Sequence, residues 1–452
     1  MTERGVSRSE IGIYREKIAR IGRLGRKSRA LAKRVIDASS CLVIPGAVDP
    51  HVHLQLDIAP GMRTADDFET GTRTAAAGGV TTIIDYTTPQ PGQSPLEAFE
   101  SRRKQAEGRA HVDYNLHNVL IGWERDWAED LGRLVRLGST SVKLFMIYAE
   151  RGWQADDAML IEVMEACRRL GIVVCIHAEN DSLIGLYTSR QKEQGAGADG
   201  LAMARPPLTE AEAAARAIRF SEATGARLHL VHLSTAESAR LVGAARRGGL
   251  QVSGETCPQY LALDKKLLAG NEGHLWGCCP PLRGRAERAG LMKALQRGWL
   301  QAIGTDHCTF TRKQKDTWDG DFTLIPYGLP GLETSLPVTY TIGPGRDRLP
   351  VTQWVKLHTA GPASLFGLYP RKGTLRKGSD ADIVIWDPGV KRDFKAEQLQ
   401  GACDWNPFSR MRVSGIARHV LLRGREIAAE GRYSGPGGEG LYQLRRRAAR
   451  SH

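Results

Sequence analysis

Short apolar runs alternate with longer helix-favouring stretches over most of the chain, starting near residue 47. Stretches such as 158–170, 210–224 and 236–247 carry apolar residues at helical spacing between those runs. Alternation of this kind predicts an α/β fold with a parallel sheet. Eight runs favour a (β/α)8 TIM barrel over a doubly wound sheet. The predicted strands are 48–54, 80–86, 114–121, 141–146, 172–177, 228–233, 250–254 and 300–305.

Both ends of the chain show shorter strand and turn patterns. Residues 11–22 form one such pattern, and segments 373–375, 381–386 and 419–422 form another. These segments predict a small β-sandwich domain built from both chain ends. The expected organisation is an N-terminal part of that domain (1–45), a metal-dependent barrel (46–370), the C-terminal part of the small domain (371–436) and a basic tail (437–452). We expect the chain after Ser434 to be loosely held.

Composition narrows the class of protein. The chain has 452 residues, 41% of them hydrophobic and 25% charged, which is typical of a globular protein with one large and one smaller domain. No apolar stretch approaches the length of a membrane span, and the first residues are polar and basic, so we expect no signal peptide and no anchor. The eight cysteines lack repeated CxxC spacing, which favours free thiols in a reducing cytoplasm.

The net charge of +13 raises the question of a nucleic-acid partner. Much of the basic excess lies in residues 15–34 and in Arg445, Arg446, Arg447 and Arg450. No nucleic-acid-binding module and no interleaved aromatic platform accompanies it. The pattern therefore favours a solvated basic surface over a nucleic-acid partner.

Two histidines separated by one residue, His51 and His53, end the first predicted strand. Residues i and i+2 of a strand project from the same face, so this spacing aims two imidazoles at one point, as a metal site requires. Two histidines lining a polar cleft would show the same spacing. However, His177, His232 and Asp306 also end predicted strands, and barrels place their chemistry at those ends. The recurrence predicts a metal-dependent hydrolase.

Lys143 lies inside the apolar run 141–146, where an unpaired ammonium would be costly. One interpretation is a core lysine paired with a carboxylate. The other follows from charge, because four neutral histidines and one aspartate compensate two divalent cations poorly. An anionic group supplied by the fourth strand would complete such a site.

The chain resembles the dihydropyrimidinase/D-hydantoinase branch of the cyclic amidohydrolases from about residue 18 to residue 434. Many strings in the same order are far more specific than any single motif. The strings are DPHVHL (49–54), DDFETG (66–71), SVKLFMIY (141–148), HAEN (177–180), HLST (232–235), GETCPQY (254–260), PPLR (280–283), GTDHC (304–308) and GSDAD (378–382).

The resemblance implies two divalent metal ions, usually zinc and sometimes manganese. His51 and His53 with Asp306 would hold the more buried ion, and His177 with His232 the more exposed one. Nitrogen and oxygen ligands without thiolate suit either metal.

The resemblance also implies the chemistry. Lys143, carboxylated by CO2 to a carbamate, would bridge both ions, and a hydroxide shared between them would attack the ring amide. Asp306 would accept the proton of that hydroxide and pass it to the leaving nitrogen. Tyr148 would donate a hydrogen bond to the developing oxyanion.

Departures from related families bear on the substrate. Dihydroorotase-like chains follow the histidine pair with an arginine that binds the substrate carboxylate, whereas this chain has Gln55. That difference favours an uncharged ring, either a 5-substituted hydantoin or a dihydropyrimidine. Cys279 and Tyr327 occupy positions where the family usually has a substrate-binding serine and asparagine. Phe145, with loops 54–63 and 147–155, is expected to shape the pocket.

Other functions remain as alternatives. An allantoinase or a dihydroorotase-like hydrolase would share this barrel and site. A non-catalytic binding scaffold, as in the collapsin response mediator proteins, loses metal ligands, whereas all six positions are present here. The resemblance also implies a homotetramer or homodimer. Members usually open with one more β-strand before the segment matching 10–13, so we expect this chain to be shortened there or its start to be assigned too late.

Overall fold

A sheet of eight parallel strands forms the centre of the molecule. The computed structural model describes residues 5–59, 61–124 and 126–446. The strands lie in sequence order around the sheet, and all eight predicted strands are confirmed. They are β4 (Ala47–Val52), β7 (Val80–Tyr86), β8 (Asp113–Val119), β9 (Ser141–Phe145), β10 (Val173–His177), β11 (Arg227–Leu230), β12 (Val252–Thr256) and β13 (Ala302–Ile303).

Backbone contacts between the first strand and the segment after the last one close this sheet. The amide of His53 donates to the carbonyl of His307 (2.8 Å), and the amide of Asp306 donates to the carbonyl of His51 (2.9 Å). Val52 also forms a parallel bridge with His307. The predicted (β/α)8 barrel is therefore confirmed.

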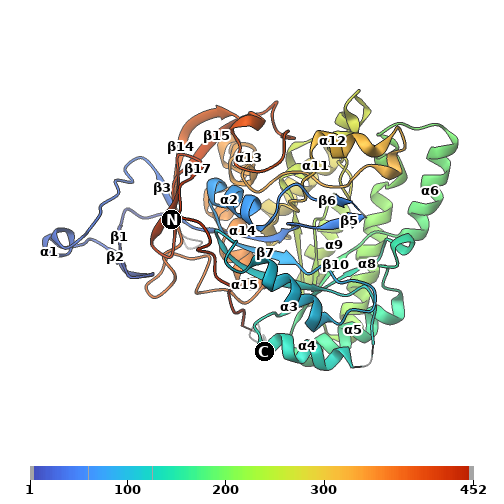
Figure 1. Ribbon diagram of the computed structural model, residues 1–452, viewed down its shortest axis with the longest axis horizontal. Coiled ribbons are helices and arrows are strands. Elements are labelled where there is room, and N and C mark those ends of the chain that lie inside the picture. Colours follow the sequence, from blue (N-terminus) through green and yellow to red (C-terminus); the bar gives the residue numbers. More distant parts are fainter. Residues whose placement is uncertain (1–4, 60, 125, 447–452) are drawn as a thin grey trace.

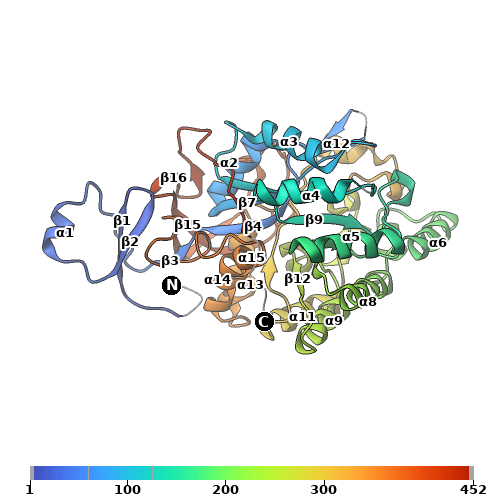
Figure 2. The same cartoon turned by 90° about the horizontal axis from the view of Figure 1, so that it is seen from below.

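Helices cover the outside of the barrel. Figure 2 shows α4, α5, α8, α9 and α11 lying one beside the next around it, as their contacts require. The helices are α1 (Arg26–Ala30), α2 (Phe68–Gly78), α3 (Pro95–Ala106), α4 (Trp127–Arg136), α5 (Asp157–Leu170), α6 (Asp181–Glu193), α7 (Gly200–Ala204), α8 (Pro207–Thr224), α9 (Ala236–Arg247), α10 (Pro258–Ala262), α11 (Arg285–Gln296), α12 (Arg312–Lys315), α13 (Ser335–Ile342), α14 (Val351–His358) and α15 (Ala360–Leu365). The described residues include no helix that is both long and apolar enough to cross a membrane.

Local sequence signals set several helix ends. Asp67 accepts hydrogen bonds from the backbone amides of Glu69 and Thr70 and so begins α2. Gly171 adopts the left-handed conformation (φ 70°) that ends α5 two residues before β10 begins at Val173. Such caps fix where each helix releases the chain to the next barrel strand.

Both chain ends contribute to a second, antiparallel sheet, as predicted. Its strand order is β17-β16-β15-β14-β3. The N-terminal strand β3 pairs with β14, so that Pro45 lies opposite Ile383. The strands are β3 (Leu42–Pro45), β14 (Ile383–Asp393), β15 (Arg412–Leu422), β16 (Arg425–Ala429) and β17 (Arg432–Tyr433).

Two hairpins lie apart from these sheets. β1 (Glu10–Tyr14) and β2 (Lys17–Gly22) form one that projects with α1 away from the barrel (Figure 1). It is tied to the small domain because the amide of Ile18 donates to the carbonyl of Ser379 (3.0 Å). β5 (Asp57–Ala59) and β6 (Met62–Arg63) form the other, directly after the histidine pair of β4.

The expectation of a loosely held tail is wrong for residues 440–446. Tyr442 forms a parallel bridge with Tyr114 at the start of β8. Arg445 is only 3% exposed and donates to the carbonyl of Leu116 (2.7 Å) and to the hydroxyl of Ser141 (2.9 Å). Its guanidinium is held because it supplies donors to buried oxygen atoms of the barrel. Arg447 and Arg450 lie outside the described residues.

A buried lysine joins the small domain to the barrel. The ammonium of Lys372 lies 2.5 Å from Asp113 on β8, 2.9 Å from Asp380 and 2.7 Å from Asp382. Burial disfavours its charged form, but the three carboxylates raise the pKa of Lys372 above its ordinary value. These carboxylates lie close enough together to hold a metal ion. Lys372, together with Arg423 on Asp113 and Lys17 on Asp380, already neutralises them, so we interpret the cluster as structural.

Candidate metal centre

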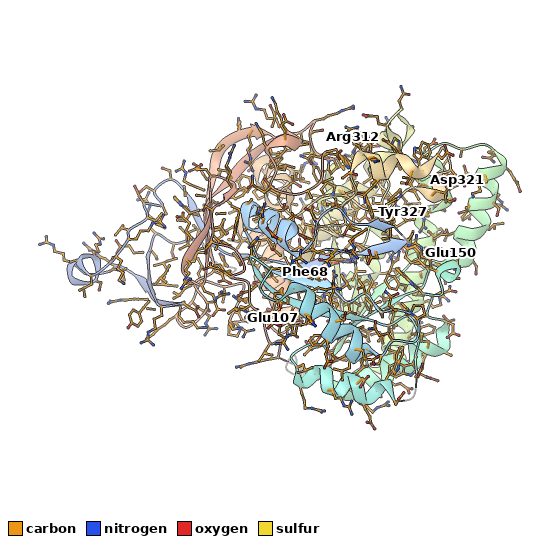
Figure 3. The ribbon with its side chains drawn as sticks, viewed as in Figure 1. Phe68, Glu107, Glu150, Arg312, Asp321 and Tyr327 are labelled. Atoms are coloured by element: carbon orange, nitrogen blue, oxygen red, sulfur yellow. The ribbon has the colours of Figure 1, made fainter. Side chains whose placement is uncertain are left out.

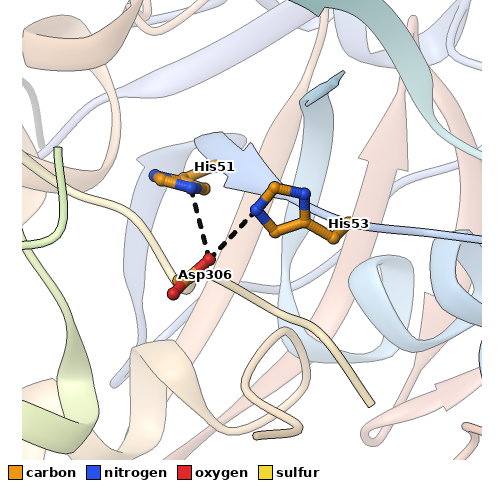
Figure 4. Close-up of side chains that lie close together, drawn as sticks. All are labelled: His51, His53 and Asp306. Atoms are coloured by element: carbon orange, nitrogen blue, oxygen red, sulfur yellow. Dashed lines mark ion pairs between the residues drawn. The ribbon is translucent and has the colours of Figure 1, made fainter. Parts of the chain in front are cut away.

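Three side chains meet where the two ends of the barrel sheet join. Nε2 of His51 and Nε2 of His53 each lie 3.2 Å from Oδ1 of Asp306 (Figure 4). His51 and His53 reach this point together because they lie two residues apart at the end of β4. Asp306 follows β13 in a left-handed conformation (φ 52°), which is uncommon for a residue with a side chain. One ligand atom from each residue lies within 4.8 Å of the others.

The second predicted histidine pair lies beside this group. The rings of His177 and His232 are 4.4 Å apart, centroid to centroid, and the ring of His232 is 5.2 Å from that of His51. His177 ends β10, and His232 follows β11 with a φ of 40°. The structure therefore brings all four predicted histidines and Asp306 to one end of the barrel.

Lys143 lies on β9 and is 1% exposed. Its Nζ is 5.4 Å from the ring centroid of Tyr86 and 5.1 Å from that of Phe145. In the part of the chain that the structure describes, no carboxylate forms an ion pair with this ammonium, which disfavours the paired core lysine. Burial lowers the pKa of Lys143 to about 8, although Asp306 and Glu255 favour its charged form.

Unpartnered nitrogen atoms show that this donor set fits a metal ion. Nδ1 of His232 is buried and has no hydrogen-bond partner among the described residues, and Nε2 of His51 forms no hydrogen bond beside its ion-pair approach to Asp306. Burial lowers the pKa of both imidazoles, so each keeps a free lone pair near neutral pH. Neutral imidazole and carboxylate are ordinary ligands of zinc and manganese.

The predicted substrate-binding residues gather on the His177 side of this group. The ring centroids of Tyr148 and Phe145 lie 5.5 Å and 6.1 Å from that of His177. Burial raises the pKa of the Cys279 thiol to about 12, while a hydrogen bond with Tyr148 opposes the rise. Cys279 and Tyr327 pack in the same apolar cluster.

A buried cation lies beside these residues. The guanidinium of Arg205 is 5.5 Å from the ring centroid of Tyr327 and forms an ion pair with Glu179 (2.8 Å). Tyr327 and Glu150, which follows Tyr148 by two residues, both lie on the side of the molecule away from the β1–β2 hairpin (Figure 3). Loops after several different strands therefore form this side of the site.

The sequence matches the amidohydrolase family over residues 42–426. The chain belongs to the amidohydrolase family. Curated relatives place it in the hydantoinase and dihydropyrimidinase group, which confirms the relationship predicted from the motifs. A D-hydantoinase of Geobacillus stearothermophilus is 40% identical over 98% of this chain and 94% of the relative. A dihydropyrimidinase of Rattus norvegicus is 35% identical over 92% of this chain and 81% of the relative.

Solved structures agree with this assignment. The dihydropyrimidinase from Brevibacillus agri NCHU1002 superposes with a TM-score of 0.95 at 36% identity, covering 100% of this chain and 98% of that one. An L-hydantoinase (dihydropyrimidinase) from Arthrobacter aurescens gives a TM-score of 0.91 at 30% identity, covering 98% and 97%. The whole described fold is thus that of these amidohydrolases.

Glu255 of this amidohydrolase has a role that was not predicted from the sequence. Glu255 lies on β12, is fully buried and accepts a hydrogen bond from Nδ1 of His51 (2.5 Å). It also lies 3.2 Å from Nε2 of His229. A carboxylate that holds one imidazole nitrogen orients the other nitrogen toward a metal. A glutamate inside a buried strand was the signal that could have found it.

Glu179 has the same relation to the second histidine pair of the amidohydrolase. Its carboxylate accepts a hydrogen bond from Nε2 of His177 (2.7 Å) and pairs with Arg205. Burial alone would raise the pKa of Glu179, but Arg205 and His177 lower it to about 2. His177 is thereby left with Nδ1 as its free nitrogen. The spacing of two residues between His177 and Glu179 was the available signal.

Proposed function

We propose that this chain is a metal-dependent cyclic amidohydrolase that opens the ring amide of 5-substituted hydantoins or dihydropyrimidines. One observation carries the proposal. Four histidines and Asp306 converge around a buried lysine at the end of the barrel where such folds place their chemistry. The names of the relatives, hydantoinases and dihydropyrimidinases, support the substrate class.

Two divalent ions fit the donor set, zinc first and manganese as the alternative. His51, His53 and Asp306 would hold one ion, and His177 and His232 the other. Bound metal would supply an activated water at neutral pH and polarise the amide carbonyl.

Lys143, as a CO2-derived carbamate, would be the anionic bridge between the two ions. Its pKa of about 8 supports this assignment, because a neutral amine, the form that reacts with CO2, is accessible near neutral pH. Among the described residues, no carboxylate forms an ion pair with Lys143. This agrees with a lysine that carries a negative charge as a carbamate rather than a positive charge as an ammonium.

The reaction needs a proton carrier and an oxyanion donor. Although burial favours the neutral acid, His51 and His53 lower the pKa of Asp306, so its carboxylate is ionised and can accept a proton. Asp306 would then deliver that proton to the leaving amide nitrogen. Burial raises the pKa of Tyr148 well above its ordinary value, so the phenol keeps its proton and can donate to the developing oxyanion.

An uncharged ring fits this site better than an acidic one. Gln55 carries no charge, and its side-chain oxygen accepts a hydrogen bond from Arg109 (3.0 Å). The test is a ring-opening assay of metal-loaded protein on dihydrouracil, a 5-aryl hydantoin, allantoin and dihydroorotate. We expect the first two to have the highest kcat/KM. Dihydroorotate or allantoin as the best substrate would support the alternative hydrolases, and no turnover of any ring would support the scaffold.

A prediction concerns Cys279, which takes the place of the usual serine. A thiol is a weaker hydrogen-bond partner than a hydroxyl, and the difference should be worth about 1 kcal/mol, or several-fold in kcat/KM, for a small ring. We therefore expect Cys279→Ser to improve turnover of dihydrouracil more than turnover of a bulky 5-aryl hydantoin. If the serine variant gains nothing on any ring amide, Cys279 serves packing alone.

We further propose that the protein works in the cytoplasm as a homotetramer or homodimer. The eight free thiols support a reducing compartment. Exposed apolar side chains in the segment 6–35 would offer apolar area for self-association. Val6 is 62%, Tyr14 67%, Leu31 83% and Val35 76% exposed. Light scattering of the metal-loaded protein measures the subunit count.

A further inference from the structure

We propose that Lys315 is a positioning residue whose ammonium holds together the two segments that carry the substrate contacts Cys279 and Tyr327. By fixing these segments, it sets KM for the ring amide. This inference rests on the proposed function, because it assumes that those segments bind the ring.

The contacts of Lys315 join the two segments directly. Lys315 ends α12 and is fully buried. Its Nζ donates to the carbonyl of Gly277 (2.8 Å), two residues before Cys279, and to the carbonyl of Pro326 (2.5 Å), the residue before Tyr327. One ammonium thus links two carbonyl oxygens that lie 49 positions apart in the sequence.

A backbone hydrogen bond adds to this link. The amide of Gly328 donates to the same carbonyl of Gly277 (3.0 Å). Gly328 adopts a φ of 149°, and a Cβ there would lie 2.2 Å from the carbonyl oxygen of Cys308. Gly328 therefore has no room for a side chain, and Lys315 lies where the segments 277–279 and 326–328 meet. Without the ammonium, the carbonyl of Pro326 would lose a buried donor.

The surroundings of Lys315 do little to stabilise its charge. In the described part of the chain no carboxylate pairs with it, and the groups that face it are neutral. They are the ring of Phe310, at 5.7 Å, and the thiols of Cys278, Cys279, Cys308 and Cys403. Burial raises the pKa of every one of these thiols. An apolar residue would fit such a site at lower energetic cost, so the lysine is best explained by the two carbonyls that it holds.

The same burial makes this link sensitive to pH. Burial lowers the pKa of Lys315 to about 8. Its charged form therefore predominates below pH 8 and is lost as the pH rises through that value, whereas the four thiols stay protonated over the same range. We expect KM for the ring amide to rise above pH 8.

The test compares Lys315→Met with Lys313→Met in the full-length, metal-loaded protein. Lys313 lies exposed on the same helical turn and serves as the matched control. At pH 7 we expect Lys315→Met to raise KM for dihydrouracil about tenfold, the effect of one hydrogen bond to a charged group, with kcat changed less. Its KM should also lose the rise above pH 8, which Lys313→Met should keep. Lys315→Gln, which retains a neutral donor, should recover part of the KM.

Hydrogen exchange of peptides covering 276–282 and 325–330 gives a readout that needs no activity. We expect faster exchange at Gly328 in Lys315→Met and unchanged exchange in Lys313→Met. A folded Lys315→Met protein with wild-type KM or wild-type exchange would overturn the inference. If that variant does not fold, a constant wild-type KM from pH 7 to 9.5, or Lys315→Gln with wild-type exchange, overturns it. If Lys315→Met exchanges faster at Gly328 but the wild-type protein opens no ring, the proposed function is refuted instead.

Discussion

Asp306→Asn is expected to lower turnover by about 10²–10⁴-fold, the usual contribution of a positioned acid–base group. The amide keeps the size of the carboxylate and one oxygen that can bind a metal, so the fold and much of the metal should remain. It cannot accept a proton, however, and it also loses the charge that His51 and His53 stabilise at 3.2 Å. Steady-state kinetics with dihydrouracil, together with metal analysis of the same samples, measures both effects.

The matched control for this change is Asp157→Asn. Asp157 lies on the surface at the start of α5, pairs with Arg216 and is 55% exposed, so its replacement should leave turnover unchanged. An Asp306→Asn protein that keeps its metal and the wild-type rate would show that another group moves the proton. Loss of all metal together with activity would instead reduce the role of Asp306 to that of a ligand.

Lys143→Ala is expected to remove at least one metal ion per chain and nearly all activity. The alanine leaves no nitrogen to form a carbamate, although the charge of Lys143 acts on His51, His177 and His232. Short-chain carboxylic acids such as acetate should restore part of the metal content and part of the rate, because they supply the missing anion. Metal analysis with and without added acetate gives a readout independent of turnover.

Lys356→Ala, an exposed lysine on α14, controls for the loss of a lysine elsewhere. It should retain full metal content and should not respond to acetate. If Lys143→Ala also keeps all its metal and its rate, the carbamate assignment fails, and Lys143 is a core lysine of the barrel. Recovery of metal without recovery of rate would point to a further role in orienting the substrate.

Local sequence patterns predicted most of the fold. Each of the eight barrel strands is a short apolar run between amphipathic helices, and both kinds of pattern depend only on neighbours in sequence. The pairing of His51 with His53 was equally predictable, since side chains two residues apart in a strand share a face. The buried tail could not be predicted in this way. Nothing in the basic string around Arg445 indicates that its guanidinium donates to buried oxygen atoms of Leu116 and Ser141.

The sequence by itself determined the fold class, the family and the set of residues that could bind metal. These follow from periodicity, from strand-end placement and from ordered strings. Only the tertiary structure decided how those residues are held. Glu255 orients His51 from 204 residues away, and Lys315 joins two loops through their backbone carbonyls. Such contacts depend on barrel closure and on burial, because hydrogen bonds and charges gain their strength only where folding has removed water.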